Sequence, residues 1–277
     1  MTAAATLIAA LAAPDGAALP VPRTMLVGAH PDDEAVGAGA RLERLQDAVF
    51  VCVTDGAPRD GKDAAQHGLS PQEYAKTRRR ELETALARCG VAADQVIGLD
   101  CPDQQAALTM VPLTRRLAEL LVQHRIEVVL THPYEGGHPD HDATAFIVHA
   151  AVALVRGSGH AVDIVEWTSY HRGPDGALTG AFLPHPEVDA QAVTLPLTPE
   201  ERQRKEAVIA CHFTQRFTLK NLPTDTERFR PAPRYDFLQP PHDWKLHYEN
   251  HPWGMSGERF RELAAQALEE LQLKGLL

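Results

Sequence analysis

Two short stretches of the chain combine histidine with carboxylate side chains, a pairing typical of metal sites that perform hydrolysis. The first reads His30-Pro-Asp-Asp-Glu34, and the second reads His138-Pro-Asp-His-Asp142. Imidazole and carboxylate ligands suit zinc and its divalent neighbours. Two such stretches in one chain are much less frequent by chance than either alone, so we interpret them as parts of one metal site.

Each stretch directly follows an apolar run that is predicted to be a buried strand. The run 25–29 must end in a turn, because Pro31 lacks a backbone N–H and disfavours helix in the residue before it. The run 127–130 leads into the second stretch. Ligand sites in open α/β sheets lie at the carboxyl ends of strands, which is where both stretches are expected.

Strand and helix patterns alternate from residue 24 to about residue 170, which predicts a mostly parallel sheet with helices on both faces. The expected strands are 25–29, 48–54, 95–99, 127–131 and 163–170. In the common doubly wound order, 3-2-1-4-5, the order reverses between strands one and four. Because the two His/Asp stretches follow those two strands, topology and chemistry independently place them in one crevice.

Capping signals bound several of the expected helices. Ser70, Pro71 and Glu73 form a helix-start signature, and Ser256 is a candidate cap for the last helix. The expected helices are about 34–46, 71–89, 111–124, 142–156, 198–213 and 256–273.

The chain has 277 residues, enough for one α/β domain with a sizeable core. We predict a single domain over 1–277, with its core at about 24–215 and an irregular extension over 217–277 that ends in a helix. Residues 217–254 are expected to wrap over the domain. The Ala-rich start lacks positive charge before Arg23, so a short packed helix or a frayed end is expected rather than a leader peptide.

Composition excludes several classes of partner. The net charge of −10 argues against nucleic acid, and no apolar run approaches the ~20 residues of a membrane span. The four cysteines, at positions 52, 89, 101 and 211, show no CxxC pairing, which favours buried thiols and a cytoplasmic, reducing compartment. A homo-oligomer is compatible with the sequence.

The two His/Asp motifs resemble those of the PIG-L/LmbE-like family of zinc-dependent N-acetylglucosaminyl deacetylases. Weaker family-like features are Thr54-Asp-Gly56, Arg78-Arg-Arg-Glu81, Pro102-Asp103, and Lys205 followed by His212-Phe-Thr-Gln215. The resemblance spans about residues 24–215 and implies a Rossmann-like fold. It implies an enzyme that removes an acetyl or other acyl group from the amine of an amino sugar or an N-acetylglucosamine conjugate. It also implies Zn²⁺ as cofactor, with Fe²⁺ or another divalent metal as chemical alternatives.

The resemblance also implies a role for each motif residue. The residues at the zinc-ligand positions are His30, Asp33 and His141. Three protein ligands leave a position for water, as in catalytic zinc sites. Asp32 resembles the general base, and His138 resembles the residue that stabilises the oxyanion or protonates the leaving amine. Asp140 would orient one of the histidines by a hydrogen bond.

Three further residues are candidates for substrate binding. Arg78 offers a planar donor fork to a hydroxyl or phosphate, with a solvated helix face as the alternative. Asp103 is placed to accept hydrogen bonds from sugar hydroxyls. Some family members have a Tyr two residues before the first His of the second motif. Here that residue is Gly136, and whether Tyr134 substitutes is open. Other histidines, such as His149, are expected at the surface.

Four alternatives stand beside this interpretation. The chain could be a metallohydrolase for another amide or an ester, or a metal-binding interaction protein without catalysis. The first motif alone could be a helix cap. A nucleotide-binding module is disfavoured, because Gly28, Gly37 and Gly39 do not form a GxGxxG pattern and the carboxylates would repel a pyrophosphate.

Overall fold

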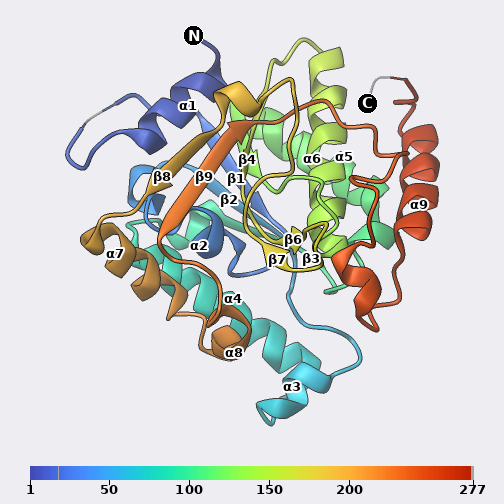
Figure 1. Ribbon diagram of the computed structural model, residues 1–277, viewed down its shortest axis with the longest axis horizontal. Coiled ribbons are helices and arrows are strands. Elements are labelled where there is room, and N and C mark those ends of the chain that lie inside the picture. Colours follow the sequence, from blue (N-terminus) through green and yellow to red (C-terminus); the bar gives the residue numbers. More distant parts are fainter. Residues whose placement is uncertain (18, 276–277) are drawn as a thin grey trace.

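The computed structural model describes residues 1–17 and 19–275. Its centre is a seven-stranded sheet in the order β3-β2-β1-β4-β5-β9-β8, drawn in Figure 1. The strands are β1 (Thr24–Gly28), β2 (Val49–Thr54), β3 (Val96–Cys101), β4 (Val128–Thr131), β5 (Asp163–Trp167), β8 (Val193–Pro196) and β9 (Thr226–Pro231). The first five pair in parallel, which confirms the predicted order 3-2-1-4-5. Every residue of β1, β2 and β4 is buried, as expected for apolar strands covered on both faces.

Two strands that the sequence did not predict extend this sheet. β9 pairs antiparallel with β5 and with β8, so the C-terminal extension contributes a strand to the main sheet. β9 was missed because it is rich in charged residues that, by composition, belong in solvent. Instead Glu227 pairs with Lys205 at 3.2 Å and Arg230 pairs with Glu166 at 2.9 Å, all of them buried.

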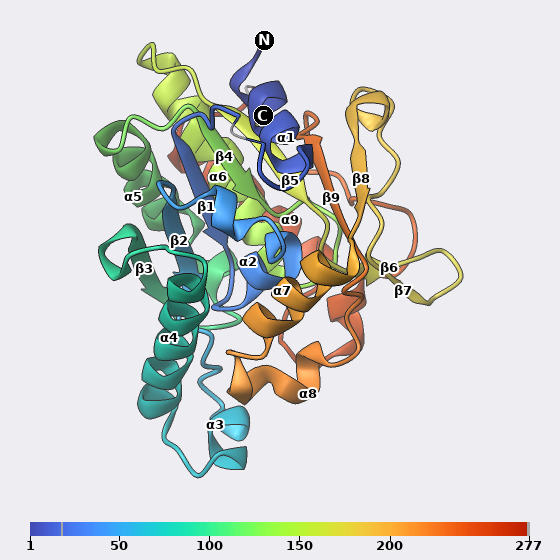
Figure 2. The same ribbon diagram turned by 90° about the vertical axis from the view of Figure 1, so that its left-hand side faces the viewer.

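Helices cover both faces of the sheet, as Figure 2 shows. The α-helices are α1 (Ala3–Ala12), α2 (Asp33–Ala38), α3 (Lys62–Gln66), α4 (Pro71–Arg88), α5 (Met110–Gln123), α6 (Pro139–Gly157), α7 (Pro199–Ile209), α8 (Arg216–Leu219) and α9 (Gly257–Glu270). Helices α5, α6 and α9 share one apolar core with the sheet, and α1, α2, α4 and α7 share a second core on the other face. The α/β fold class is therefore confirmed.

Short 3-10 helices and a small hairpin complete the architecture. The 3-10 helices are η1 (Leu42–Arg44), η2 (Ala93–Gln95), η3 (Ala106–Leu108), η4 (Asp189–Gln191), η5 (Phe213–Gln215) and η6 (His247–Asn250). The hairpin pairs β6 (His171–Arg172) with β7 (Leu178–Thr179).

Two helix boundaries differ from the prediction near the His/Asp motifs. The first predicted helix, about 34–46, is divided into α2 and η1 around Gly39. Helix α6 begins at Pro139 rather than at about 142, with His138 as its cap. The earlier start follows from the fixed φ of Pro139, which suits the first helical position. Consequently the second motif forms the first turn of a helix rather than a loop.

The remaining predictions for the chain ends and cysteines agree with the structure. Helix α1 packs into the core through Leu7 and Leu11, and Ser256 caps α9. Within the described part of the chain the cysteines are free, and three of the four are buried. Among the described residues, no helix combines the length and apolar character needed to cross a membrane.

Candidate metal centre

The two His/Asp motifs meet at the carboxyl edge of the sheet. The first forms the turn between β1 and α2, and the second forms the start of α6 after β4. Strands β1 and β4 are hydrogen-bonded neighbours, which brings the motifs together. The six residues drawn from these motifs, each at most 8% exposed, are His30, Asp32, Asp33, His138, Asp140 and His141.

His30, Asp33 and His141 lie in contact with one another. Nδ1 of His30 lies 3.2 Å from Nε2 of His141. Oδ1 of Asp33 lies 3.3 Å from Nε2 of His141, and its other oxygen, Oδ2, lies 3.5 Å from Nδ1 of His30. Ligands at 2.0–2.1 Å from a tetrahedral zinc ion lie about 3.3 Å from one another. The separations and the chemistry of the donors therefore fit a zinc-type ion.

The second nitrogen or oxygen of each ligand candidate is held by another polar group. Nε2 of His30 lies 3.3 Å from Asp140 and 3.3 Å from Asp103. Such outer contacts fix which nitrogen of a histidine is free to coordinate a metal. Asp140 also accepts the backbone N–H groups of Gln104 and Ala106, so it joins His30 to the loop after β3.

The contacts of His141 and Asp33 follow the same pattern. Nδ1 of His141 contacts Oγ of Ser169 at 3.2 Å. Asp33 accepts the backbone N–H of His30 and contacts His132 at 3.0 Å. Burial alone would raise the pKa of the Asp33 carboxyl, but His132 and His141 outweigh burial and hold that pKa well below its usual range. Asp33 therefore faces the cluster as a carboxylate.

Three sets of side chains in and around the motifs bring one metal-binding atom per residue within 4.8 Å of one another. These sets are His30 with His138 and His141, His30 with Asp103, His138 and Asp140, and Asp33 with His132 and His141. The site is thus dense in metal-binding atoms, and all of these side chains are buried.

His138 is held as a neutral hydrogen-bond donor. Its Nδ1 accepts the backbone N–H of Asp140 at 3.1 Å, which leaves the ring proton on Nε2. Burial, reinforced by the neighbouring His30 and His141, holds the pKa of His138 well below its usual range. The ring of Trp253 packs against it with centroids 4.5 Å apart.

Asp32 forms a buried ion pair with Arg78. Nη2 of Arg78 donates to Oδ2 of Asp32 at 2.7 Å, and Nη1 donates to the Gly56 carbonyl at 2.7 Å. Arg78 is only 4% exposed, so the alternative of a solvated helix face does not hold for this residue. Among the described residues, Oδ1 of Asp32 has no hydrogen-bond partner, so one carboxylate oxygen stays available.

The three candidates for substrate binding lie in different environments. The guanidinium of Arg78 is paired with Asp32, and the carboxylate of Asp103 contacts His30. The structure does not bring Tyr134 to the cluster, because its hydroxyl donates to the Gln239 carbonyl at 3.0 Å and its ring packs in the apolar core. His149, expected at the surface, is likewise buried in that core on α6.

The structure adds site residues that the sequence did not indicate. Ser169 and Tyr170 follow β5, the strand beside β4, and contact His141. Their position after a neighbouring parallel strand is a signal that could have identified them. Trp253 comes from the C-terminal extension and carries no comparable signal.

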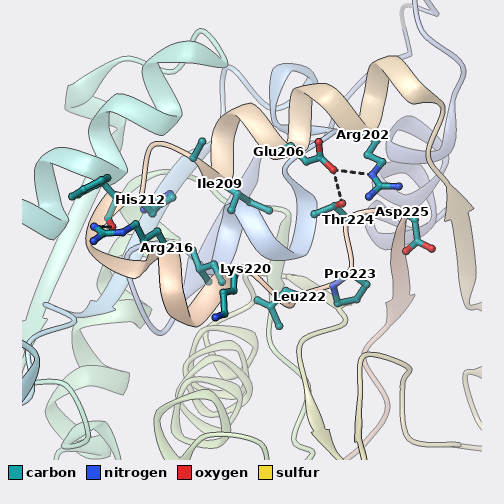
Figure 3. A pocket seen from close by; sticks show the side chains of 13 residues that line it. Arg202, Glu206, Ile209, His212, Arg216, Lys220, Leu222, Pro223, Thr224 and Asp225 are labelled. Carbon is teal, nitrogen blue, oxygen red and sulfur yellow. Dashed lines mark hydrogen bonds and ion pairs between the residues drawn. The ribbon is translucent and has the colours of Figure 1, made fainter.

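A separate cavity of about 630 Å³ lies between α7 and residues 219–225 (Figure 3). Glu206 joins its two sides by accepting hydrogen bonds from Arg202 and Thr224. His212 lines the cavity, and its Nε2 lies 3.6 Å from Glu34 of the first motif. Both side chains of this pair are buried.

Comparison with known families decides which group the motifs represent. The sequence pattern of the PIG-L family, described as GlcNAc-PI de-N-acetylase, matches residues 25–152. The resemblance expected from the motifs is thereby confirmed, and all six motif residues lie within the matched range.

Relatives of this chain include two proteins named as deacetylases. The 1D-myo-inositol 2-acetamido-2-deoxy-alpha-D-glucopyranoside deacetylase of Kineococcus radiotolerans is 29% identical over 50% of this chain and 46% of the relative. The diacetylchitobiose deacetylase of Thermococcus kodakarensis is 31% identical over 48% of this chain and 50% of the relative. The chain thus matches about half the length of these relatives.

Solved structures share the fold of this chain at low sequence identity. A deacetylase of the teicoplanin biosynthesis pathway has a TM-score of 0.59 and 20% identity, covering 77% of this chain and 99% of its own. The 4-carboxy-2-hydroxymuconate hydratase of Pseudomonas putida has a TM-score of 0.51 and 17% identity, covering 78% and 98%. Because one fold carries both reactions, the reaction must be argued from the site.

Proposed function

We propose that this chain is a divalent-metal-dependent hydrolase that removes the N-acetyl group from an amino sugar or its conjugate. The observation that carries the proposal is the convergence of His30, Asp33 and His141 within 3.2–3.5 Å of one another, beside Asp32. The relatives named as deacetylases of 2-acetamido sugars support the substrate class. A free amine and acetate would be the products.

His30, Asp33 and His141 would hold the metal. The donor set of two imidazoles and one carboxylate suits zinc, and it also suits iron(II). When bound, the metal supplies Lewis-acid chemistry that makes water acidic enough to act as a nucleophile near neutral pH. The contacts of His30 with Asp140 and of His141 with Ser169 orient the two rings for this role.

Asp32 would be the general base that takes a proton from the attacking water. Arg78 holds one oxygen of the Asp32 carboxylate and leaves the other oxygen available. Since Asp33 next to it faces the metal ligands, the two adjacent carboxylates have separate tasks. Proton transfer by a positioned side chain contributes roughly 10²–10⁴-fold to rates of this kind.

His138 would stabilise the oxygen of the amide carbonyl as water adds to the carbon. Its Nε2 carries the ring proton and is therefore a hydrogen-bond donor. As the C–N bond breaks, the nitrogen keeps the electron pair of that bond and takes the proton held by Asp32. The product then leaves as the amine. Water thus supplies the hydroxyl of acetate and the hydrogen of the amine.

A panel of acyl substrates tests this function against its alternatives. The panel holds N-acetylglucosamine, N-acetylglucosaminyl-inositol, diacetylchitobiose, a non-sugar acetamide and an acetyl ester. We expect amine release from the amino sugars that a chelator abolishes and zinc restores. Hydrolysis of only the ester or the non-sugar acetamide would favour a different metallohydrolase. Metal binding without any hydrolysis would favour an interaction protein.

A further inference from the structure

The hydroxyl of Tyr170 is distinguished from those of the other tyrosines by its surroundings. The hydroxyls of Tyr74, Tyr134 and Tyr235 are hydrogen-bonded to Gln215, Gln239 and Glu166 respectively. The hydroxyl of Tyr248 is sealed in the core. Within the described ranges 1–17 and 19–275, the Tyr170 hydroxyl makes no hydrogen bond and is not sealed from solvent. Its bonding capacity is therefore unused.

Tyr170 lies directly against His141, one of the three proposed metal ligands. Its ring is 5.5 Å from the ring of His141 in an edge-on arrangement, and its neighbour Ser169 contacts the same histidine. Burial raises the pKa of the Tyr170 hydroxyl, His30 lowers it, and Asp33 is the first of the carboxylates that raise it again. The Tyr170 hydroxyl is therefore close enough to these side chains for them to change its pKa.

The backbone of Tyr170 is pinned to the loop that precedes His138. A Cβ atom on Gly137 would collide with the carbonyl oxygen of Tyr170, so the two segments are in close contact. The ring of His247 packs on the other side of Tyr170, with centroids 5.6 Å apart. Tyr170 is thus held between the second motif and the C-terminal extension.

A side chain at position 136 has no room in this chain. A Cβ on Gly136 would lie 2.7 Å from Cδ2 of Leu246 and 3.4 Å from His242, and Gly136 has a φ of +73° that favours glycine. Tyr134, two residues earlier, uses its hydroxyl elsewhere. Neither position 136 nor Tyr134 therefore brings a phenol to the cluster, whereas the segment after β5 places Tyr170 against His141.

We propose that the Tyr170 hydroxyl donates a hydrogen bond to the carbonyl oxygen of the scissile amide as that oxygen becomes negatively charged. Tyr170 and His138 would then hold this oxygen from the ends of two neighbouring strands, β5 and β4. The bond strengthens as charge develops, so it lowers the barrier more than it aids substrate binding. This inference rests on the proposed deacetylase function.

The variant Tyr170→Phe removes the hydroxyl and keeps the ring. We expect kcat to fall by about 10²–10³-fold, as for the loss of other oxyanion donors, with KM and metal content close to wild type. Binding of a methylphosphonamidate analogue of the N-acetyl group, measured by calorimetry, should weaken by a similar factor. The matched control Tyr248→Phe removes a sealed hydroxyl and should change neither quantity.

The outcomes separate this inference from the function on which it rests. Full kcat and full analogue affinity in Tyr170→Phe would overturn the role of Tyr170 and leave the deacetylase function standing. Loss of metal in Tyr170→Phe would also overturn it, because the residue would then support the metal site. A wild-type protein that neither releases amine nor binds the analogue would overturn the proposed function itself.

Discussion

Replacing Arg78 by Met should destabilise the protein, because the buried Asp32 carboxylate would lose its positively charged partner. Arg78 donates to Asp32 and to the Gly56 carbonyl at 2.7 Å each, and its side chain is almost fully buried. Both bonds have the charged guanidinium as donor, and a hydrogen bond of this kind contributes about 1.5–3 kcal/mol. Their sum agrees with the ~3–5 kcal/mol measured when one partner of a buried ion pair is removed.

The assay is urea unfolding at pH 7 followed by circular dichroism. We expect the free energy of unfolding of Arg78→Met to be about 3–5 kcal/mol lower than that of wild type. Arg80→Met is the matched control, because Arg80 lies two residues along the same helix and is exposed. Its effect should stay within about 0.5 kcal/mol.

A double variant tests whether the ion pair itself causes the loss. Arg78→Met combined with Asp32→Asn removes both charges, so the double variant should be more stable than Arg78→Met alone. The reasoning would be refuted if Arg78→Met were as stable as Arg80→Met. It would also be refuted if the second substitution added its full cost instead of offsetting the first.

Three other substitutions, the first with a matched control, test packing, protonation and a buried ion pair. Gly37→Ala places a Cβ 2.5 Å from the Trp167 ring and should cost about 1–3 kcal/mol, whereas Gly157→Ala, with nothing within 4 Å, should not destabilise. Burial lowers the pKa of His149 to about 3, so wild-type stability should fall as pH drops from about 6.5 toward that value. In urea unfolding from pH 7 to 4, His149→Phe should reduce this slope by up to about 1.4 kcal/mol per pH unit, and an unchanged slope would contradict the assignment. Lys205→Met removes the cation that pairs with the buried carboxylate of Glu227 on β9, and it should lower the free energy of unfolding by about 3–5 kcal/mol in the same assay. A decrease below about 1 kcal/mol would contradict the pairing.

The strand order and the meeting of the two motifs were predictable from the sequence. Both rest on local signals: apolar runs that end in turns rich in His, Asp and Pro, and a β-α alternation that permits few topologies. Because strands β1 and β4 are neighbours in that topology, residues that follow them had to lie together. His30 and His141, 111 positions apart in the sequence, are consequently in contact.

The environments of charged side chains were not predictable in the same way. Arg78, Arg79 and Arg80 look alike in the sequence, yet only Arg78 is buried, because its partner Asp32 arrives from a distant turn. The charges of β9 were misjudged for the same reason, since Glu166 and Lys205 meet them only in the fold. Burial of a charge depends on tertiary partners that no local pattern specifies.

The C-terminal extension illustrates a second limit. Residues 217–254 show no regular period, but Trp253 packs on His138 and the backbone N–H of His247 donates to the Gly136 carbonyl. Such contacts join irregular segments to the site one residue at a time. Sequence periodicity carries no information about them.

The most direct test of the central claim is to measure metal content and amine release together in Asp32→Asn and His141→Ala. We expect wild type and Asp32→Asn each to bind a single metal ion per chain, and Asp32→Asn to lose turnover. His141→Ala should lose both the metal and turnover, because only two of the three ligands remain. Wild-type metal content and turnover in His141→Ala would contradict the assignment of the metal centre.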